Sequence, residues 1–395
     1  MTPRSPAAAE ARTRAFLTEL LAAVPIARGQ GTAAERLAAL ERAALFTPVF
    51  ADWPTPVDEW LQEGCPLARE LGRADVVARL ELRQAVIHMR RLALDAAQAA
   101  VDAVQIPATS PTAAADTAWQ IATQARILVR RQGFDAARAL LATITPPPRD
   151  TWTAWLPIVA RAELEVEAAD HGAASATLHT ALEGMPGELV EERIQCLQAL
   201  GFVLVTRGDA RAARRHLDHA RHLLRAAGAW PEVIQMNLAV GSLSAAVRDH
   251  TAAQRMFQEA GELCRRHPRP QLEALLHMGA ARSAAALGAF DLAVAAALEA
   301  ARHYAAHGSV VGYVSMVVFV ARLYAEANHP AEAYRTLATG LAVARHRRWQ
   351  VVEDLLRTRI KHLREDVVGA EAFDAMVTAM LEKHRQTSAG STAAH

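Results

Sequence analysis

The stretch of residues 196–227, CLQALGFVLVTRGDARAARRHLDHARHLLRAA, decides the fold of this 395-residue chain. Apolar residues fall three and four positions apart on either side of the turn at Gly208-Asp209, and the small residues Gly201 and Ala213 stand within the two apolar stripes. Residues at this spacing share one face of a helix. The stretch therefore predicts two helices joined by a tight turn, with small residues that allow the helices to pack closely.

The same hairpin recurs at an almost constant interval. Its alanine returns as Ala97, Ala137, Ala174, Ala213, Ala253, Ala293 and Ala333, at intervals of 40, 37, 39, 40, 40 and 40 residues. Twelve residues earlier, a second small residue stands at Ala85, Ala125, Gly201, Gly241, Ala281 and Ala321. Only the third repeat is not placed, because Arg161 and Glu165 fall where apolar residues are expected. A fixed interval of this length is typical of a stacked helical repeat, which usually serves as a surface for holding other molecules.

Over about residues 76–345 this pattern resembles the tetratricopeptide repeat (TPR) family. The interval is longer than the usual ~34 residues, and leucine or alanine replaces most of the family's aromatic residues. In this respect the chain is similar to the bacterial long-repeat type, with units of about 40 residues. The resemblance implies an all-α fold, a right-handed α–α superhelix of about seven helical hairpins.

The segments outside the repeats are expected to cover or extend the array. Residues 1–15 are predicted to be a mobile tail and residues 16–75 a helical N-terminal cap, because the exposed end of a solenoid core must be covered. Residues 346–385 are predicted to form a divergent C-terminal helix pair. The small and polar residues 386–395 predict a disordered tail.

Composition argues against several classes of partner. The chain carries 43 basic and 42 acidic residues, so its net charge of +1 creates no global field for nucleic acid or an anionic membrane. The longest apolar run, residues 310–321, is too short to cross a bilayer, and the N-terminus lacks the apolar core of a signal peptide. We therefore expect a cytoplasmic protein with no nucleic-acid or membrane partner.

The sequence contains no recognisable catalytic motif. A glycine-rich phosphate loop, an HExxH pair and a GxSxG elbow are all missing from the sequence, so we expect no catalytic residues, no cofactor and no enzyme activity. His216, His219 and His222 lie three residues apart, a spacing that lets two of them share a helix face and bind a metal. Neighbouring arginines disfavour a cation there, so an ordinary polar helix face is the favoured interpretation and no metal site is predicted.

The family resemblance implies a ligand groove on the concave face, lined by the first helix of each hairpin. The groove positions of the family are occupied in this sequence by Met89, Arg90, Arg126, Arg130, Phe202, Arg282, Arg322 and Glu326. Arginine binds carboxylates through two parallel hydrogen bonds, so the groove suits a partner with acidic or C-terminal carboxylate groups. Equally open is the alternative that these arginines pair with neighbouring acids of their own chain.

The sequence therefore predicts a non-enzymatic protein- or peptide-binding adaptor that uses the concave face of a helical-repeat superhelix. The alternative is a ligand-responsive regulatory protein, a peptide sensor or regulator arm, that changes superhelical shape on binding. The two hypotheses differ in whether the ligand shifts the conformation.

Overall fold

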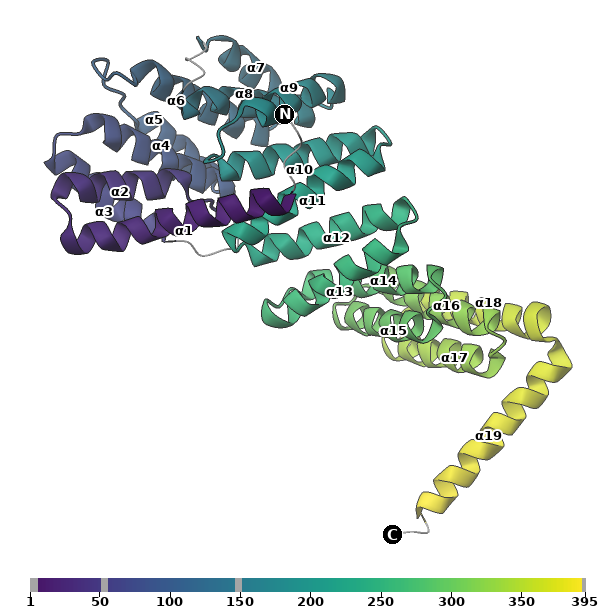
Figure 1. Cartoon of the computed structure of the whole chain (residues 1–395). Helices are drawn as coiled ribbons and strands as arrows, with labels where there is room; N and C mark the ends of the chain where they lie inside the picture. Colours follow the sequence, from purple (N-terminus) through teal and green to yellow (C-terminus); the bar gives the residue numbers. More distant parts are fainter. Residues whose placement is uncertain (1–5, 51–55, 146–150, 393–395) are drawn as a thin grey trace. The chain divides into compact units, whose positions relative to one another are not determined.

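The chain consists of helices and the turns between them throughout residues 6–50, 56–145 and 151–392, which the structure describes. In this computed structural model those ranges contain no strand (Figure 1). The helices are α1 (Pro6–Gln30), α2 (Ala33–Phe46), α3 (Val57–Glu70), α4 (Ala74–Arg90), α5 (Leu94–Ala103), α6 (Ala113–Arg130), α7 (Phe134–Ala142), the 3₁₀ turn η1 (Trp152–Trp155), α8 (Leu156–Glu167), α9 (His171–Gly184), α10 (Val190–Thr206), α11 (Ala210–Ala227), α12 (Trp230–Ala246), α13 (His250–Arg266), α14 (Pro270–Ala286), α15 (Phe290–Ala306), α16 (Val310–Glu326), α17 (Pro330–His346), α18 (Gln350–His362), the π-helical segment η2 (Leu363–Val368) and α19 (Ala370–Thr392). The predicted all-α solenoid of helical hairpins is confirmed.

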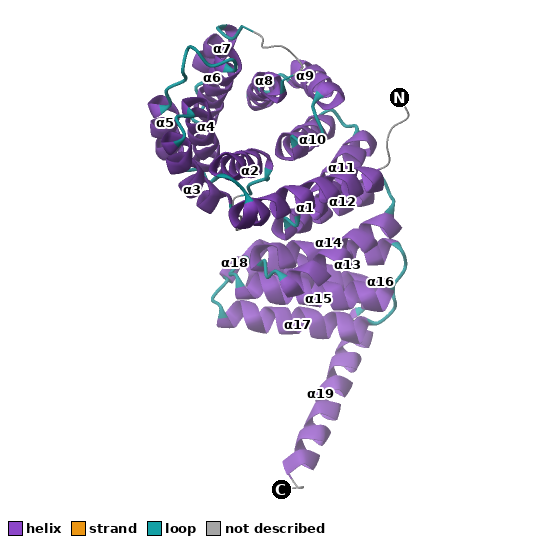
Figure 2. Ribbon diagram, turned by 60° about the vertical axis from the view of Figure 1, so that its left-hand side comes forward, coloured by secondary structure: helices purple, strands orange, loops and turns teal. Residues whose placement is uncertain are grey.

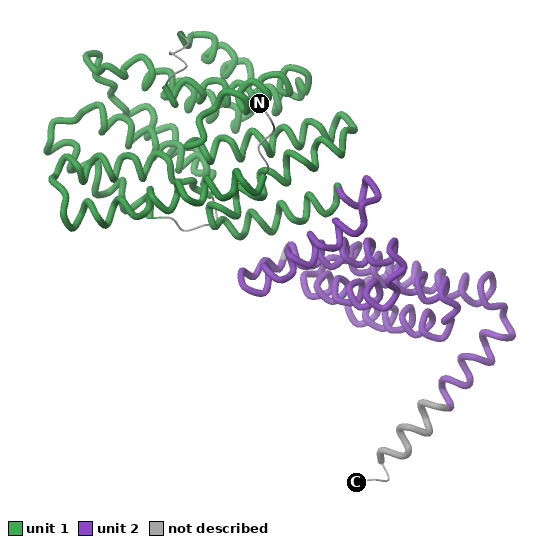
Figure 3. The backbone as a smooth tube through the Cα atoms, in the orientation of Figure 1, with its two compact units in different colours: residues 1–243 green, residues 244–395 purple. Residues whose placement is uncertain are grey.

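Two compact units divide these helices, Met1–Leu243 and Ser244–His395 (Figure 3). We call them unit 1 and unit 2. Within each unit, helices adjacent in sequence pack on one another, as α10 does on α11 and α16 on α17. The division falls inside the predicted repeat array of residues 76–345, although the interval of the alanines continues across it without a break.

Each hairpin turns at a residue in the left-handed conformation. This residue stands five positions before the repeated alanine in all seven hairpins, with φ between 60° and 82°, at Leu92, Gln132, Ala169, Gly208, Arg248, Gly288 and Asn328. In the fourth hairpin the next N–H, that of Asp209, donates to Leu204 O at 2.9 Å and closes the first helix. The Asp209 side chain then accepts from Ala212 N at 2.9 Å and opens the second helix.

The small residues bring the two helices of a hairpin into close contact. All seven repeated alanines have no exposed surface. A Cβ atom added at Gly201 would lie 2.5 Å from Leu217 Cδ2, so only glycine fits there without displacement of the leucine. Ala162, twelve residues before Ala174, is also buried on α8. The third repeat therefore follows the same register as the others, although Arg161 and Glu165 obscure it in the sequence.

Helices extend into both predicted tails. At the N-terminal end, α1 begins at Pro6, inside the tail predicted over residues 1–15, and it buries Leu17 and Leu20 as part of the core. At the C-terminal end, α19 continues to Thr392, through most of the tail predicted over residues 386–395. Residues 1–5 and 393–395 lie outside the described residues. The predicted C-terminal pair corresponds to α18 and α19, with η2 and Gly369, at φ 88°, between them.

The helices of unit 1 curve round until the first of them meets the fourth hairpin (Figure 2). There α1 packs against α11, and Glu10 Oε2 of α1 lies 2.6 Å from His222 Nδ1 of α11. Helices α2, α8 and α10 face the inside of the curve (Figure 2). The N-terminal helices therefore contact both the first and the fourth repeat, which brings α4 and α10 close together inside unit 1.

Candidate binding sites

A buried charge network links α4 and α10 inside unit 1. Arg83 donates to Ala44 O (3.0 Å), Thr47 O (2.7 Å) and Glu191 Oε2 (2.9 Å). The same Glu191 oxygen accepts from Val49 N at 3.0 Å. Arg83 and Glu191 are almost fully buried. The end of α2 and the residues after it are thus held inside unit 1 through their main chain, in the position where a concave groove was predicted.

The charge on Glu191 is stabilised by its surroundings. Burial alone would raise the pKa of this carboxyl, but the guanidinium groups of Arg83 and Arg90 and the N–H of Val49 outweigh burial and lower the pKa to about 2. The pKa of the neighbouring Glu192 is shifted in the opposite direction. Burial, together with the charge of Glu191, raises the pKa of Glu192.

Arg126, one of the predicted groove residues, lies in a second buried ion pair. Its Nε and Nη2 donate to the two oxygens of Glu163 at 3.0 and 2.7 Å, and Nη2 also donates to Gln195 Oε1 at 3.1 Å. The side chain is 4% exposed. Burial disfavours the ionised carboxyl, but Arg126 lowers the pKa of Glu163 below its ordinary value. Arg126 thus pairs with an acid of its own chain, as the alternative interpretation of the groove arginines proposed.

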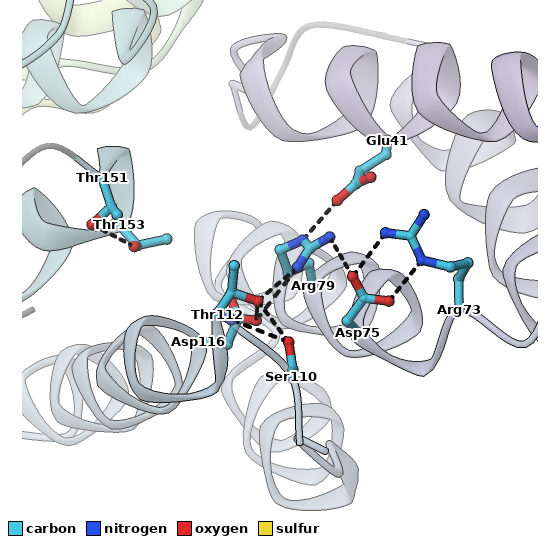
Figure 4. Close-up of polar contacts among 9 residues, drawn as sticks. All are labelled: Glu41, Arg73, Asp75, Arg79, Ser110, Thr112, Asp116, Thr151 and Thr153. Atoms are coloured by element: carbon cyan, nitrogen blue, oxygen red, sulfur yellow. Dashed lines mark hydrogen bonds and ion pairs between the residues drawn. The ribbon is translucent and has the colours of Figure 1, made fainter. Parts of the chain in front are cut away.

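A third polar cluster joins residues of α2, α4 and the start of α6 (Figure 4). Arg79 lies 2.6 Å from Glu41, 3.2 Å from Asp75 and 3.5 Å from Asp116, and it donates to Thr112 Oγ1 at 3.1 Å. Burial raises the pKa of Asp116, which is 1% exposed, despite its hydrogen bond with Thr112. The donors of Arg79 are used within the protein, so this cluster holds helices together rather than presenting a charge to a ligand.

A cavity of about 610 Å³ in unit 1 brings three of the predicted groove residues together, Arg90, Arg130 and Phe202. Its walls come mainly from α6, α8 and α10. Phe202 is 53% exposed, and the Arg130 side chain is 39% exposed and lies 3.9 Å from Glu167. Met89, in contrast, is 2% exposed and belongs to the core.

A second cavity, of about 640 Å³, lies in unit 2 between α14 and α16. It brings together the remaining predicted residues, Arg282, Arg322 and Glu326. Arg322 Nε lies 3.5 Å from Glu326 Oε1, and the two side chains are 63% and 64% exposed. The Arg322 guanidinium also lies over the ring of Phe319, 5.4 Å from its centre. We call this site the unit 2 groove.

Sequence reasoning missed the buried acids that pair with the arginines of unit 1. Glu163 stands one residue after the small residue Ala162, as Arg126 stands one residue after Ala125. The repeat pattern therefore contained a signal for Glu163 that an unplaced third repeat concealed. No local signal identified Glu191, because it meets Arg83 across 108 residues of sequence.

The three histidines of α11 do not converge. His222 approaches Glu10, whereas the ring of His216 lies 6.0 Å from that of His179. Burial, aided by nearby positive groups, lowers the pKa of His219 to about 4. Within the described ranges, no three His, Cys, Asp or Glu side chains are placed to hold a metal ion. None of the helices described has the length and apolar character needed to span a membrane.

Comparisons with known proteins show likeness only at the level of fold. No family model matches the chain, and no curated protein is similar to it in sequence. Among solved structures, a Rap protein complexed with competence and sporulation factor has 14% identity and a TM-score of 0.41, covering 78% of this chain and 87% of that one.

Two further structures are similar at comparable levels. A signal-transduction ATPase with numerous domains and a tetratricopeptide repeat sensor, from Pyrococcus horikoshii, has 13% identity and a TM-score of 0.46, covering 82% of this chain and 55% of that one. The Cut9–Hcn1 hetero-tetramer of APC/C has 11% identity and a TM-score of 0.33, covering 85% and 64%. The chain thus spans less than two thirds of these two. All three TM-scores are low, so the description of the chain as a TPR-like solenoid rests on its own hairpins.

Proposed function

We propose that this chain is a non-enzymatic binding protein whose unit 2 groove holds a peptide segment of another protein through a carboxylate. The observation that carries the proposal is the convergence of Arg282, Arg322 and Glu326 around one cavity of about 640 Å³. These residues come from two first helices, α14 and α16, which are 40 residues apart in the repeat. A cavity of this size accommodates a few side chains of a peptide.

The charge of the groove favours an acidic group. Arg282 is exposed and forms no ion pair with any residue that the structure describes. Arg322 shares only a solvent-exposed contact of 3.5 Å with Glu326, and such contacts contribute little. Both guanidinium groups can therefore turn toward a carboxylate at low cost, and each can form two parallel hydrogen bonds with it.

The apolar side of the groove supports a peptide rather than a free small acid. Phe319 and Leu323 line the cavity beside Met316, while Ser315 adds a hydroxyl group. The Arg322 guanidinium also lies over the ring of Phe319. This contact restricts the Arg322 side chain before a ligand binds, so less conformational entropy is lost on binding. The groove thus offers an apolar contact next to a cationic one, as a C-terminal apolar residue with a free carboxylate requires.

The proposal is tested with a library of peptides that end in a free carboxylate, screened against the full chain. The tightest binder is then compared with its C-terminal amide, and with R282E/R322E protein, by fluorescence anisotropy. We expect each change to weaken binding by about 30-fold or more, equivalent to about 2 kcal/mol. The matched control is R255E/R335E, which reverses two exposed arginines of unit 2 outside the groove.

Two outcomes contradict the proposal. If the library yields no saturable binder, the groove does not hold free C-termini. Equal losses in R282E/R322E and R255E/R335E would mean that binding is non-specific electrostatic attraction. Circular dichroism of both variants shows that the comparison is made between folded proteins, which is expected because all four arginines are exposed.

A further inference from the structure

The cavity of unit 1 differs in kind from the unit 2 groove. Its volume of about 610 Å³ is within the range of small-molecule sites, and its wall is mainly apolar. Val129, Val159, Val166, Leu178 and Ala199 contribute this apolar surface from four helices, α6, α8, α9 and α10. Two arginines, Arg90 of α4 and Arg130 of α6, and two acids of α8, Glu163 and Glu167, also line it. Glu163 is paired with Arg126, and Glu167 lies 3.9 Å from Arg130.

Arg90 has donors that the protein does not use. A guanidinium carries five N–H donors, and buried donors almost always have an acceptor. The Arg90 side chain is 15% exposed, yet it forms no hydrogen bond with any residue that the structure describes. Its one polar contact is an ion pair with Glu191, 2.9 Å between Nε and Oε1, and Nη2 has no acceptor.

The neighbouring arginines show that an arginine without hydrogen bonds is unusual inside unit 1. Arg83 makes three hydrogen bonds, to Ala44 O, Thr47 O and Glu191. Arg126 likewise makes three, to Glu163 and Gln195. Glu191 therefore serves two guanidinium groups, and the one that lines the cavity is the one without hydrogen bonds.

Charged groups of both signs surround Arg90. Arg83 and Arg126 are buried and Arg90 is partly buried, and all three lie near Glu163, Glu191 and Glu192. Of these, Glu163 and Glu191 are held ionised by their ion pairs. Burial and the adjacent charge of Glu191 raise the pKa of Glu192 and favour its neutral form. The raised pKa of Glu192 reduces the tendency of this side chain to compete with an anion for Arg90.

We propose that the unit 1 cavity binds a small amphipathic carboxylate, with its acid group on Arg90 and its apolar body along Val129, Val166 and Ala199. A carboxylate supplies an acceptor to the Arg90 Nη2 group, which has none among the described residues. The apolar body displaces water from the valine-lined wall, which is favourable in proportion to the area covered. This inference is independent of the proposed function, because the cavity and the groove lie in different units.

The test uses the full chain and decanoate as the probe, measured by isothermal titration calorimetry below the concentration at which the probe forms micelles. Decanol, which has the same chain without the charge, is the matched probe. We expect saturable binding of decanoate, about tenfold weaker binding of decanol, and a loss of about tenfold in R90Q. A199W, which fills the cavity, should abolish binding.

The controls separate this site from binding elsewhere. R138Q and A176W change exposed residues of unit 1 that do not line the cavity, and they should bind decanoate as the original chain does. V166F is a second cavity-filling variant, used if A199W does not show a cooperative melt. The proposal is overturned if decanoate does not bind saturably, or if R90Q and the filled variants bind as well as the controls.

Discussion

Arg126 of unit 1 and Arg322 of unit 2 occupy the same position of the repeat, one residue after the small residue of the first helix, but their surroundings are opposite. The Arg126 side chain is 4% exposed and hydrogen-bonded to both oxygens of Glu163. The Arg322 side chain is 63% exposed, with one loose contact to Glu326. The same residue type at the same register position is therefore a structural ion pair in one unit and an available charge in the other.

The difference arises from what faces each first helix. In unit 1 the curvature of the helix array places α10 opposite α4 and α8 beside α6. The arginines on α4 and α6 therefore contact glutamates of α10 and α8 and are shielded from water. Buried charges are tolerated only when paired, which explains why Arg83 and Arg126 each have a glutamate partner. In unit 2 the groove between α14 and α16 stays open, and its arginines stay exposed.

The largest expected effect compares the two acid partners directly. E163A removes the partner of Arg126 and leaves a buried cation with only Gln195, so we expect a loss of about 3–5 kcal/mol in the free energy of unfolding. E326A removes the exposed partner of Arg322 and should change stability by at most about 1 kcal/mol. Urea denaturation of both variants provides the measurement. Similar losses would contradict the distinction between a structural and an available arginine.

A smaller loss of stability is expected when a glycine at a close helix contact is replaced, and it tests whether both units pack their helices equally closely. A Cβ atom would lie 2.5 Å from Leu217 at Gly201 in unit 1, and 2.7 Å from Val317 at Gly340 in unit 2. G201L and G340L should therefore each overpack a helix contact and lower the free energy of unfolding by about 1–3 kcal/mol.

R211L is the control for these glycine variants, because Arg211 is exposed on α11. Its thermal melt should match that of the original chain. If only one of the two glycine variants is destabilised, the close helix contact belongs to one unit and not to the repeat as a whole.

The smallest effect concerns acid. The pKa of Glu191 is lowered in the folded protein, from 4.5 to about 2. The stability that this carboxylate contributes is therefore complete above pH 4.5 and is lost as the pH falls toward 2. Each pH unit in this window costs at most about 1.4 kcal/mol from this one group. The free energy of unfolding of the original chain and of E191Q is measured from pH 6 to pH 3. The difference between the two proteins should decrease below pH 4.5, by at most this amount per pH unit. A difference that does not change with pH would contradict a lowered pKa of Glu191.

The sequence predicted the hairpins well because their signals are local. The alanine interval and the apolar positions around Ala213 specify two helices and their contact face within one stretch of chain. Burial of Arg126 was not predictable in the same way, because it depends on the curvature of unit 1 and on Glu163, which lies 37 residues away. The convergence of Arg282 and Arg322 follows from the 40-residue interval itself, which places equivalent positions of neighbouring repeats side by side.

The left-handed residue at each hairpin turn has a consequence for how this array tolerates change. Only two of the seven turns use glycine, and Asn328 is the one other residue that accepts this conformation readily. Leu92, Gln132, Ala169 and Arg248 adopt it at a cost of about 1 kcal/mol each. The packing of the two helices that flank a turn offsets this cost, so the strained residue and the contacts that stabilise it belong to the same hairpin. The turns are consequently separate sites at which the stability of the protein can be adjusted, one hairpin at a time and nearly additively, without altering either cavity.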